Sequence, residues 1–105
     1  MAIVKLARRE NEFRKLPDLV SVGPATIKDL AEIGISSVHD LREQRAEDLF
    51  ERLCAVTKVR HDPCVIDVFR AAIEQAKDPH LALQKCQWWY WSRVRKGRLS
   101  SGKRK

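Results

Sequence analysis

The segment from Leu16 to Ile35, LPDLVSVGPATIKDLAEIGI, carries the residue types best suited to binding an anion. Pro24 can open a helix there, because a proline at the first helical position lacks only an N–H that would be unpaired anyway. The amides of residues 25–27 would then have no acceptor inside the helix and would lie at the positive end of its dipole. Thr26 adds a hydroxyl and Lys28 a mobile cation. This pattern predicts contacts to a sugar-phosphate strand without readout of bases.

The turn that precedes Pro24 is Ser21-Val22-Gly23. We expect Gly23 to adopt a positive φ, which a residue without Cβ does without strain, and Val22 to point between the two helices. The pattern resembles a helix-hairpin-helix motif, whose usual turn has glycine at the position of Ser21; here Ser21 would adopt a less extreme angle or donate to a phosphate. The alternative is a hairpin that only packs helices, as in related modules that bind proteins. The predicted phosphate-binding residues are Ser21, Val22, Gly23, Ala25, Thr26 and Lys28.

The C-terminal end of the chain is a second possible source of attraction for anions. Residues 1–92 hold 14 basic and 14 acidic side chains, whereas residues 93–105 hold seven basic ones and no acid, so the net charge of +7 resides in this end. With so few apolar residues it cannot offset the entropy of ordering, and we expect a disordered tail that attracts nucleic acid or an anionic lipid surface in a salt-dependent way. The alternative is a solubilising end. The tail cations are Arg93, Arg95, Lys96, Arg98, Lys103, Arg104 and Lys105.

Cysteine and histidine residues suggest a metal site or a reactive thiol. Cys54, His61 and Cys64 could bind zinc with Cys86 or His80 as a fourth ligand, but gaps of six and two residues are not the close pairs of structural zinc. We therefore expect buried free cysteines, no metal and no disulfide framework. Cys64 could have a lowered pKa at a helix start with His61 as base, yet no third orienting group is evident. Paired carboxylates and a P-loop are also missing from the sequence, so we expect no enzyme and no cofactor.

Four of the seven aromatic residues are consecutive, at positions 88–91, next to the basic end. Such rings beside arginines could stack on unpaired bases or on a flat drug. The alternative, which a small domain favours, is that two or more of them complete the core. We expect Trp88 or Trp89 to be buried and Trp91 to be partly exposed.

Turn and cap residues divide positions 1–92 into short helices, and no run alternates apolar with polar residues as a half-buried strand does. One strong apolar stripe lies at residues 46–54, and Asp62-Pro63 begins the clearest helix. The expected helices are an N-terminal one broken near 9–11 and ending at Leu16, 17–20, one from Pro24 stopped by Gly34, 38–41 capped by Ser36 or Ser37, one along the 46–54 stripe, 63–76, and 80–87. We expect an all-α domain at 1–92 and a disordered basic tail at 93–105.

A set of short motifs lies between the hairpin and the end of the aromatic segment QWWYW, namely Leu53-Cys54, Cys64-Val65, Val68-Phe69-Arg70, Trp88-Trp89 and Trp91. With these motifs the sequence resembles, over about 75 residues, small bacterial helix-hairpin-helix proteins of the pathogenicity-locus or mitomycin-resistance family. Its hairpin is also similar to one in the C-terminal domain of bacterial competence regulators. The resemblance implies a compact SAM-like bundle of five or six helices and a DNA-associated role, and the family name hints at protection against a DNA-crosslinking drug.

Together these patterns favour a monomeric or weakly dimeric module that binds DNA without sequence preference. The alternative is a helical adaptor that holds a protein partner, with the tail as a solubiliser. No apolar run approaches the roughly 18 residues of a membrane span, and the first residues mix charge into the apolar stretch, unlike a secretory signal. We therefore expect a cytoplasmic protein.

Overall fold

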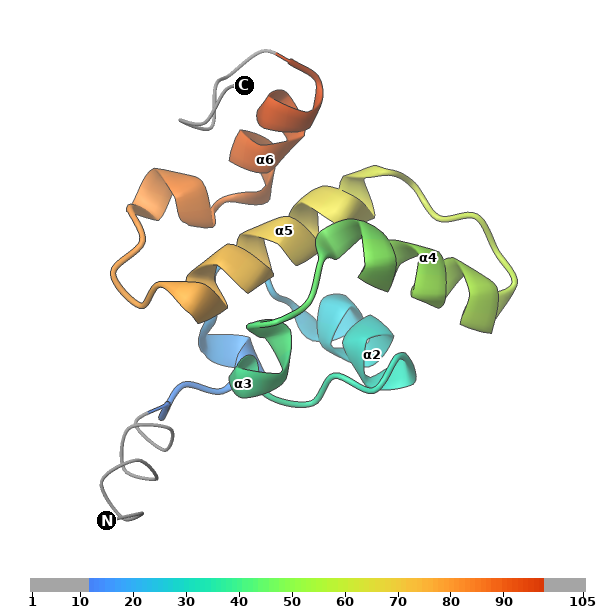
Figure 1. Ribbon diagram of the computed structural model, residues 1–105, viewed down its shortest axis with the longest axis horizontal. Helices are drawn as coiled ribbons and strands as arrows, with labels where there is room; N and C mark the ends of the chain where they lie inside the picture. The colour runs from blue at the N-terminus through green and yellow to red at the C-terminus, as the bar shows by residue number, and fades with distance from the viewer. Residues whose placement is uncertain (1–11, 98–105) are drawn as a thin grey trace.

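All regular secondary structure in residues 12–97, the part of the chain that the computed structural model describes, is helical (Figure 1). The elements are the 3₁₀-helix η1 (Leu16–Asp18), α2 (Pro24–Glu32), α3 (Val38–Leu41), α4 (Ala46–Thr57), α5 (Cys64–Lys77), the 3₁₀-helix η2 (Leu83–Cys86) and α6 (Trp88–Arg95). The predicted all-α class is confirmed. None of these helices has both the length and the apolar character that crossing a membrane requires.

Helix α5 lies at the centre of the fold, with α4 beside it and with α6 on the side away from α2 and α3 (Figure 1). One face of α5, including Phe69 and Ile73, packs into the main core with the predicted α4 stripe and with residues of η1, α2 and α3. Another face contributes Ala71 to a smaller cluster with Tyr90 and Trp91 of α6, which we call the α6 cluster. Both faces of α5 are therefore apolar, and each covers a different part of the chain.

Cap residues set the bounds of the first helices as the sequence predicts. Pro24 occupies the first position of α2. At its other end Gly34 has φ 87°, and the amides of Gly34 and Ile35 donate to the carbonyls of Ala31 and Leu30, which is a Schellman ending. The side chain of Ser37 accepts from the amide of Asp40 at 3.0 Å and so caps α3.

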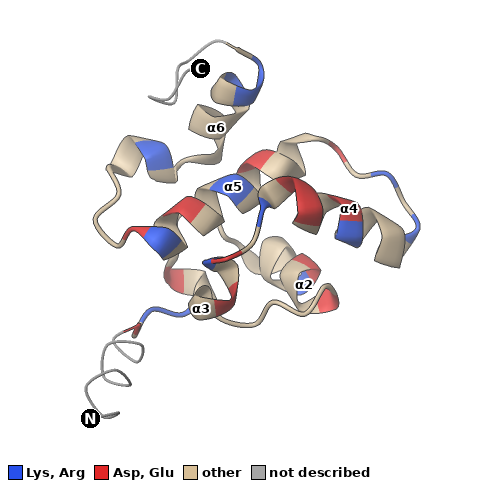
Figure 2. Ribbon diagram, in the orientation of Figure 1, with Lys and Arg blue, Asp and Glu red and all other residues tan. Residues whose placement is uncertain are grey.

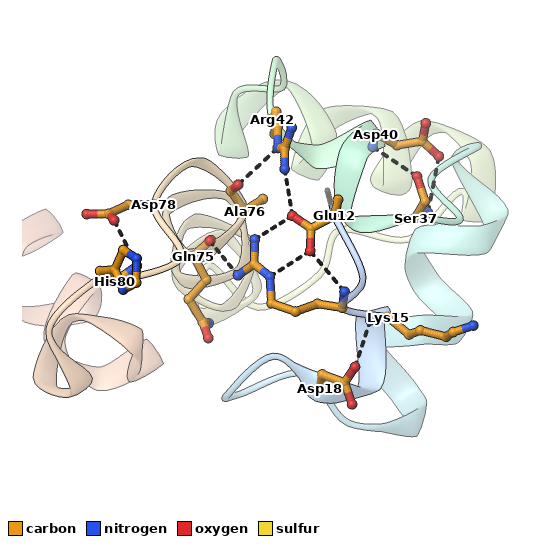
Figure 3. A network of polar contacts seen from close by, with 11 residues as sticks. Glu12, Lys15, Asp18, Ser37, Asp40, Arg42, Gln75, Ala76, Asp78 and His80 are labelled. Carbon is orange, nitrogen blue, oxygen red and sulfur yellow. Dashed lines mark hydrogen bonds and ion pairs between the residues drawn. The ribbon is translucent and has the colours of Figure 1, made fainter. Parts of the chain in front are cut away.

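Two arginines cover the C-terminal end of α5, where carbonyls lack partners within the helix. Arg14 Nη1 donates to the carbonyl of Gln75 at 2.9 Å, and Arg42 Nε donates to that of Ala76 at 3.1 Å. The Glu12 carboxylate bonds both guanidinium groups, each at 2.6 Å (Figure 3). This network fixes residues 12–14 and the loop after α3 to the end of α5.

Three predicted helices differ in the structure. The helix expected at 17–20 is the 3₁₀-helix η1, which ends at Asp18. Residues 12–15 are not helical and Phe13 is 81% exposed, whereas the remainder of the predicted N-terminal helix lies outside the described residues. Within the predicted helix 80–87 only η2 forms. The sequence did not predict α6, because WWYW is apolar on every side and has no helical contrast of apolar and polar faces.

The expectation for the tryptophans is wrong. Trp91 is 6% exposed, while Trp88 and Trp89 are 40% and 38% exposed. Helix α6 turns Trp91 toward α5, and the guanidinium of Arg70 in α5 lies 4.4 Å from the centroid of its ring. The indole Nε1 of Trp91 donates to the carbonyl of Lys85 in η2 at 2.7 Å. Packing on α5, which the local sequence does not encode, decides which ring is buried.

The expectation of disorder from residue 93 onward is wrong for its first residues. Arg93 and Arg95 lie in the last turn of α6, and Gly97 follows with φ 81°. Arg95 Nε and Nη2 each donate to the carboxylate of Asp67 at 2.9 Å, so an ion pair with α5 supplies the order that the tail composition alone does not. Residues 98–105 lie outside the described residues.

Candidate nucleic-acid interface

The hairpin turn has its positive φ at a residue other than the predicted one. Ser21 has φ 72°, whereas Gly23 has φ −104°. The Ser21 hydroxyl donates to the carbonyl of Cys86 at 3.2 Å and accepts from the amide of Trp88 at 3.0 Å. These bonds hold Ser21 in a left-handed conformation that otherwise costs a non-glycine residue about 1–2 kcal/mol. The hydroxyl is therefore engaged inside the fold, where it donates to Cys86 and not toward solvent.

Gln75 of α5 holds the same turn from the other side. Its Oε1 accepts from the amide of Val20 at 2.9 Å, and its Nε2 donates to the carbonyls of Val20 and Ala71 at 2.8 and 3.1 Å. The Gln75 side chain is buried. Its amide group supplies a hydrogen-bond acceptor and a hydrogen-bond donor to the backbone of the turn, as the backbone of a neighbouring strand would. The sequence analysis missed Gln75, although a glutamine beside Ala76 on a strongly apolar helix was a visible signal.

Val22 packs into the main core as the sequence predicts, with 8% of its surface exposed. Together Ser21, Val22 and Gln75 fix the chain on entry to α2. These contacts hold the N-terminus of α2 against α5 and the start of α6.

Two of the three predicted amides at this N-terminus are open. The amide of Ile27 donates to the carbonyl of Gly23 at 3.0 Å, so that part of the prediction is wrong. Within residues 12–97, no group accepts a hydrogen bond from the backbone amide of Ala25 or of Thr26. Ala25 is exposed and Thr26 half-buried. Lys28 is exposed one turn further on and pairs with Glu32 at 3.3 Å.

The first turn of α2 also lacks acidic side chains. The first turns of α3, α4 and α5 contain Asp40, Glu47 with Asp48, and Asp67, respectively, whereas those of α2 and α6 contain none. The bond from Trp88 to Ser21 places the start of α6 next to the turn before α2. From η2 to the end of α6 the charged side chains are all basic (Figure 2). The first turns of α2 and α6 therefore contain no carboxylate that would repel an anion there.

The tail cations have different surroundings. The Arg93 guanidinium lies 4.9 Å from the ring centroid of Trp89, Arg95 is bound to Asp67, and Lys96 is the C-cap residue of α6. The predicted cations Arg98, Lys103, Arg104 and Lys105 lie outside the described residues.

The cysteine and histidine residues are not brought together in a metal-binding arrangement. Cys54 is buried and accepts from the backbone amide of His61 at 3.5 Å, while the His61 ring bonds the Thr57 hydroxyl at 2.8 Å. The hydrogen bond to Asp62 raises the pKa of the Cys64 thiol, opposite to the lowering that a helix start would cause. Burial raises the pKa of the Cys86 thiol. Across residues 12–97, no three His, Cys, Asp or Glu side chains group as metal ligands would.

Comparison with known proteins establishes the family. A family model described as pathogenicity locus, Cdd1, matches residues 9–97. The chain belongs to this pathogenicity-locus family. It is similar to the mitomycin resistance protein McrB of Streptomyces lavendulae, with 34% identity over 87 residues that cover 83% of this chain and 78% of the relative. No solved structure matches the chain. The family resemblance predicted from the sequence is confirmed.

Proposed function

We propose that this protein binds DNA through the sugar-phosphate backbone, with the N-terminus of α2 as its phosphate contact. The observation that carries the proposal is the pair of open amides, at Ala25 and Thr26, on a helix whose first turn has no acid. A phosphate oxygen placed there accepts from both amides and lies at the positive end of the helix. The bonds from Gln75 and Ser21 keep this site in place before the ligand arrives.

The distribution of charge supports the same proposal. Residues 79–105 contain eight Lys or Arg and no Asp or Glu. Part of this segment, α6, begins next to the hairpin turn through the bond between Trp88 and Ser21. Cations there release counterions from a nucleic acid and add affinity that falls with salt. We interpret η1, the turn and α2 as a hairpin of the helix-hairpin-helix type with serine in place of its first glycine.

The relative's name links it to mitomycin resistance. We propose that DNA binding by this chain likewise serves protection against drug damage to DNA. Contacts that do not read the base sequence suit that role, because lesions occur without regard to a recognition sequence.

The test uses a charge that should not unfold the helix. In Ala25→Asp, the new carboxylate lies at an exposed position in the first turn of α2. There it interacts favourably with the helix dipole and so stabilises the helix, but it repels a phosphate. The matched control is Ala31→Asp, the same charge change at an exposed position near the other end of α2. Binding of both variants to a labelled 20-base-pair duplex is measured by fluorescence anisotropy at several salt concentrations.

We expect Ala25→Asp to weaken binding about tenfold and to reduce the salt slope by about one phosphate contact, with little effect of Ala31→Asp. Equal weakening by the two variants would show that only net charge matters, and the α2 site would be rejected. Failure of the native chain to bind at low salt would reject DNA binding and favour the protein-adaptor function.

A further inference from the structure

Of the three tryptophans of α6, one is buried and two are partly exposed to solvent. Trp91 is buried in the α6 cluster, hydrogen-bonded through its indole and covered by Arg70. Trp88 and Trp89 are 40% and 38% exposed. The two indoles, consecutive at the start of α6, are apolar surface that packing within residues 12–97 leaves partly uncovered, and exposed aromatic surface of this kind is available to a ligand.

The backbone at the start of α6, which carries these two tryptophans, lies next to the turn that precedes the proposed phosphate contact. Trp88 is the first residue of α6, and its amide donates to the Ser21 hydroxyl in the turn that leads into α2. Trp89 lies in the same turn of helix, with the Arg93 guanidinium 4.9 Å from its ring centroid. A strand held at the α2 amides could therefore extend toward the start of α6, the helix that carries both indoles and Arg93.

The charge around the indoles indicates which ligand they suit. Within residues 12–97 Arg93 has no ion pair, and the sequence beyond Asp78 contains no acid. An apolar protein segment would find no complement for these cations, whereas a nucleotide offers a flat base for the indole and a phosphate for the guanidinium. Bases inside a duplex expose only their edges, so an indole face can stack only on unpaired bases.

We propose that Trp88, Trp89 and Arg93 form a stacking surface for unpaired bases, so that the preferred ligand is a duplex with a single-stranded extension. This inference rests on the proposed function, since the α2 site supplies the phosphate contact beside the stacked base. The duplex part engages the backbone contact, and the extension engages the indoles.

The experiment measures the affinity of the full chain for three DNAs. One is a blunt duplex, the second carries a five-nucleotide extension, and the third carries the same extension with abasic sites, which keeps the phosphates and removes the bases. The variants are the double changes Trp88→Ala with Trp89→Ala, and Trp88→Phe with Trp89→Phe. The matched control is Leu83→Ala, which removes an apolar side chain of η2 that is 68% exposed.

The native chain should bind the extension with bases at least about tenfold more tightly than the abasic one. The double alanine variant should lose this preference while its affinity for the blunt duplex stays unchanged. The phenylalanine variant, which retains flat rings, should keep part of the preference, and Leu83→Ala all of it. Circular dichroism of each variant tests whether the helical content is retained.

Each alternative result overturns a stated proposal. Equal binding of the basic and abasic extensions, or a preference that survives the double alanine change, overturns the stacking surface while leaving the α2 contact intact. If Ala25→Asp leaves DNA binding unchanged while the preference for the extension with bases is retained, the α2 contact alone is overturned. Binding to none of the three DNAs, with self-association that the alanine variant abolishes, would assign the indoles to a protein contact and overturn both.

Discussion

Gln75 bonds both polar groups of the Val20 main chain, accepting from the amide at 2.9 Å and donating to the carbonyl at 2.8 Å. One buried side chain thus links the hairpin turn to α5 across 55 positions of sequence. Helix α5 also contributes residues to the main core. The position of the α2 N-terminus therefore depends on the packing of α5 in that core.

Gln75→Ala should lower the free energy of unfolding by about 1–3 kcal/mol, because the Val20 amide and carbonyl lose their partners in a partly buried position. Duplex affinity should fall as well, since the turn loses its support. Urea unfolding and anisotropy measure the two effects. Gln84→Ala, at an exposed position of η2, should change neither, and equal stability of the two variants would contradict the role of Gln75.

Ser21 allows its hydrogen bonds and its backbone angle to be separated. Both Ser21→Ala and Ser21→Gly remove the bonds to Cys86 and Trp88, but only glycine accepts φ 72° without strain. Ser21→Ala should therefore be less stable than Ser21→Gly by about 1 kcal/mol, and both less stable than the native chain. Urea midpoints at unchanged slope measure the difference. An alanine variant as stable as the glycine variant would show that the turn relaxes its angle.

Glu12 should make stability depend on pH. Hydrogen bonds from Arg14 and then Arg42 outweigh burial and lower the pKa of the Glu12 carboxyl from 4.5 to about 2. A folded-state pKa below the unfolded value adds stability that is complete above the unfolded value and is lost as pH falls through 4.5 toward 2. Glu12→Gln should be less stable than the native chain at neutral pH, and the difference should shrink in acid.

Thermal unfolding of both proteins at a series of pH values measures the Glu12 effect. Glu47→Gln, at an exposed position of α4, serves as the control. Asp40 and Asp62 also have a lowered pKa, from hydrogen bonds with Ser36 and Cys64 respectively, so only the difference from the native curve reports Glu12. A constant difference across the pH range would mean that the network does not bind the charged form preferentially.

The pair of Asp67 and Arg95 should stabilise the C-terminal end of α6. Asp67 is 1% exposed, so Arg95→Gln leaves a buried carboxylate without its cation, at a cost of about 2 kcal/mol after allowance for the partly exposed arginine. Adding Asp67→Asn should recover part of this loss. Chemical denaturation of the single and double variants measures the coupling, and simple additivity would argue against a direct interaction.

The sequence contains strong signals for the elements that local chemistry determines. Pro24 and Gly34 mark the bounds of α2, Ser37 the start of α3, and the stripe from Ala46 to Cys54 the buried face of α4. Each signal operates within one or two helical turns. These elements and the burial of Val22 were therefore predictable.

The contacts that complete the candidate site join distant residues and were not predictable in this way. The conformation of Ser21 depends on Cys86 and Trp88, which are 65 and 67 positions away. The order of α6 depends on Asp67, which looks like an ordinary surface acid in a helix. Gln75 was the one detectable case, because a glutamine among buried alanines needs hydrogen-bonding partners.

The α6 cluster is separate from the main core, and this has a consequence for local opening of the molecule. Helix α6 can detach by exposing Tyr90 and Trp91 without disrupting the packing of α4 on the other face of α5. We therefore expect its amide protons to exchange with solvent through a smaller opening than those in the middle of α5. The same excursion breaks the bond between Trp88 and Ser21, so the hairpin turn loosens whenever the last helix departs.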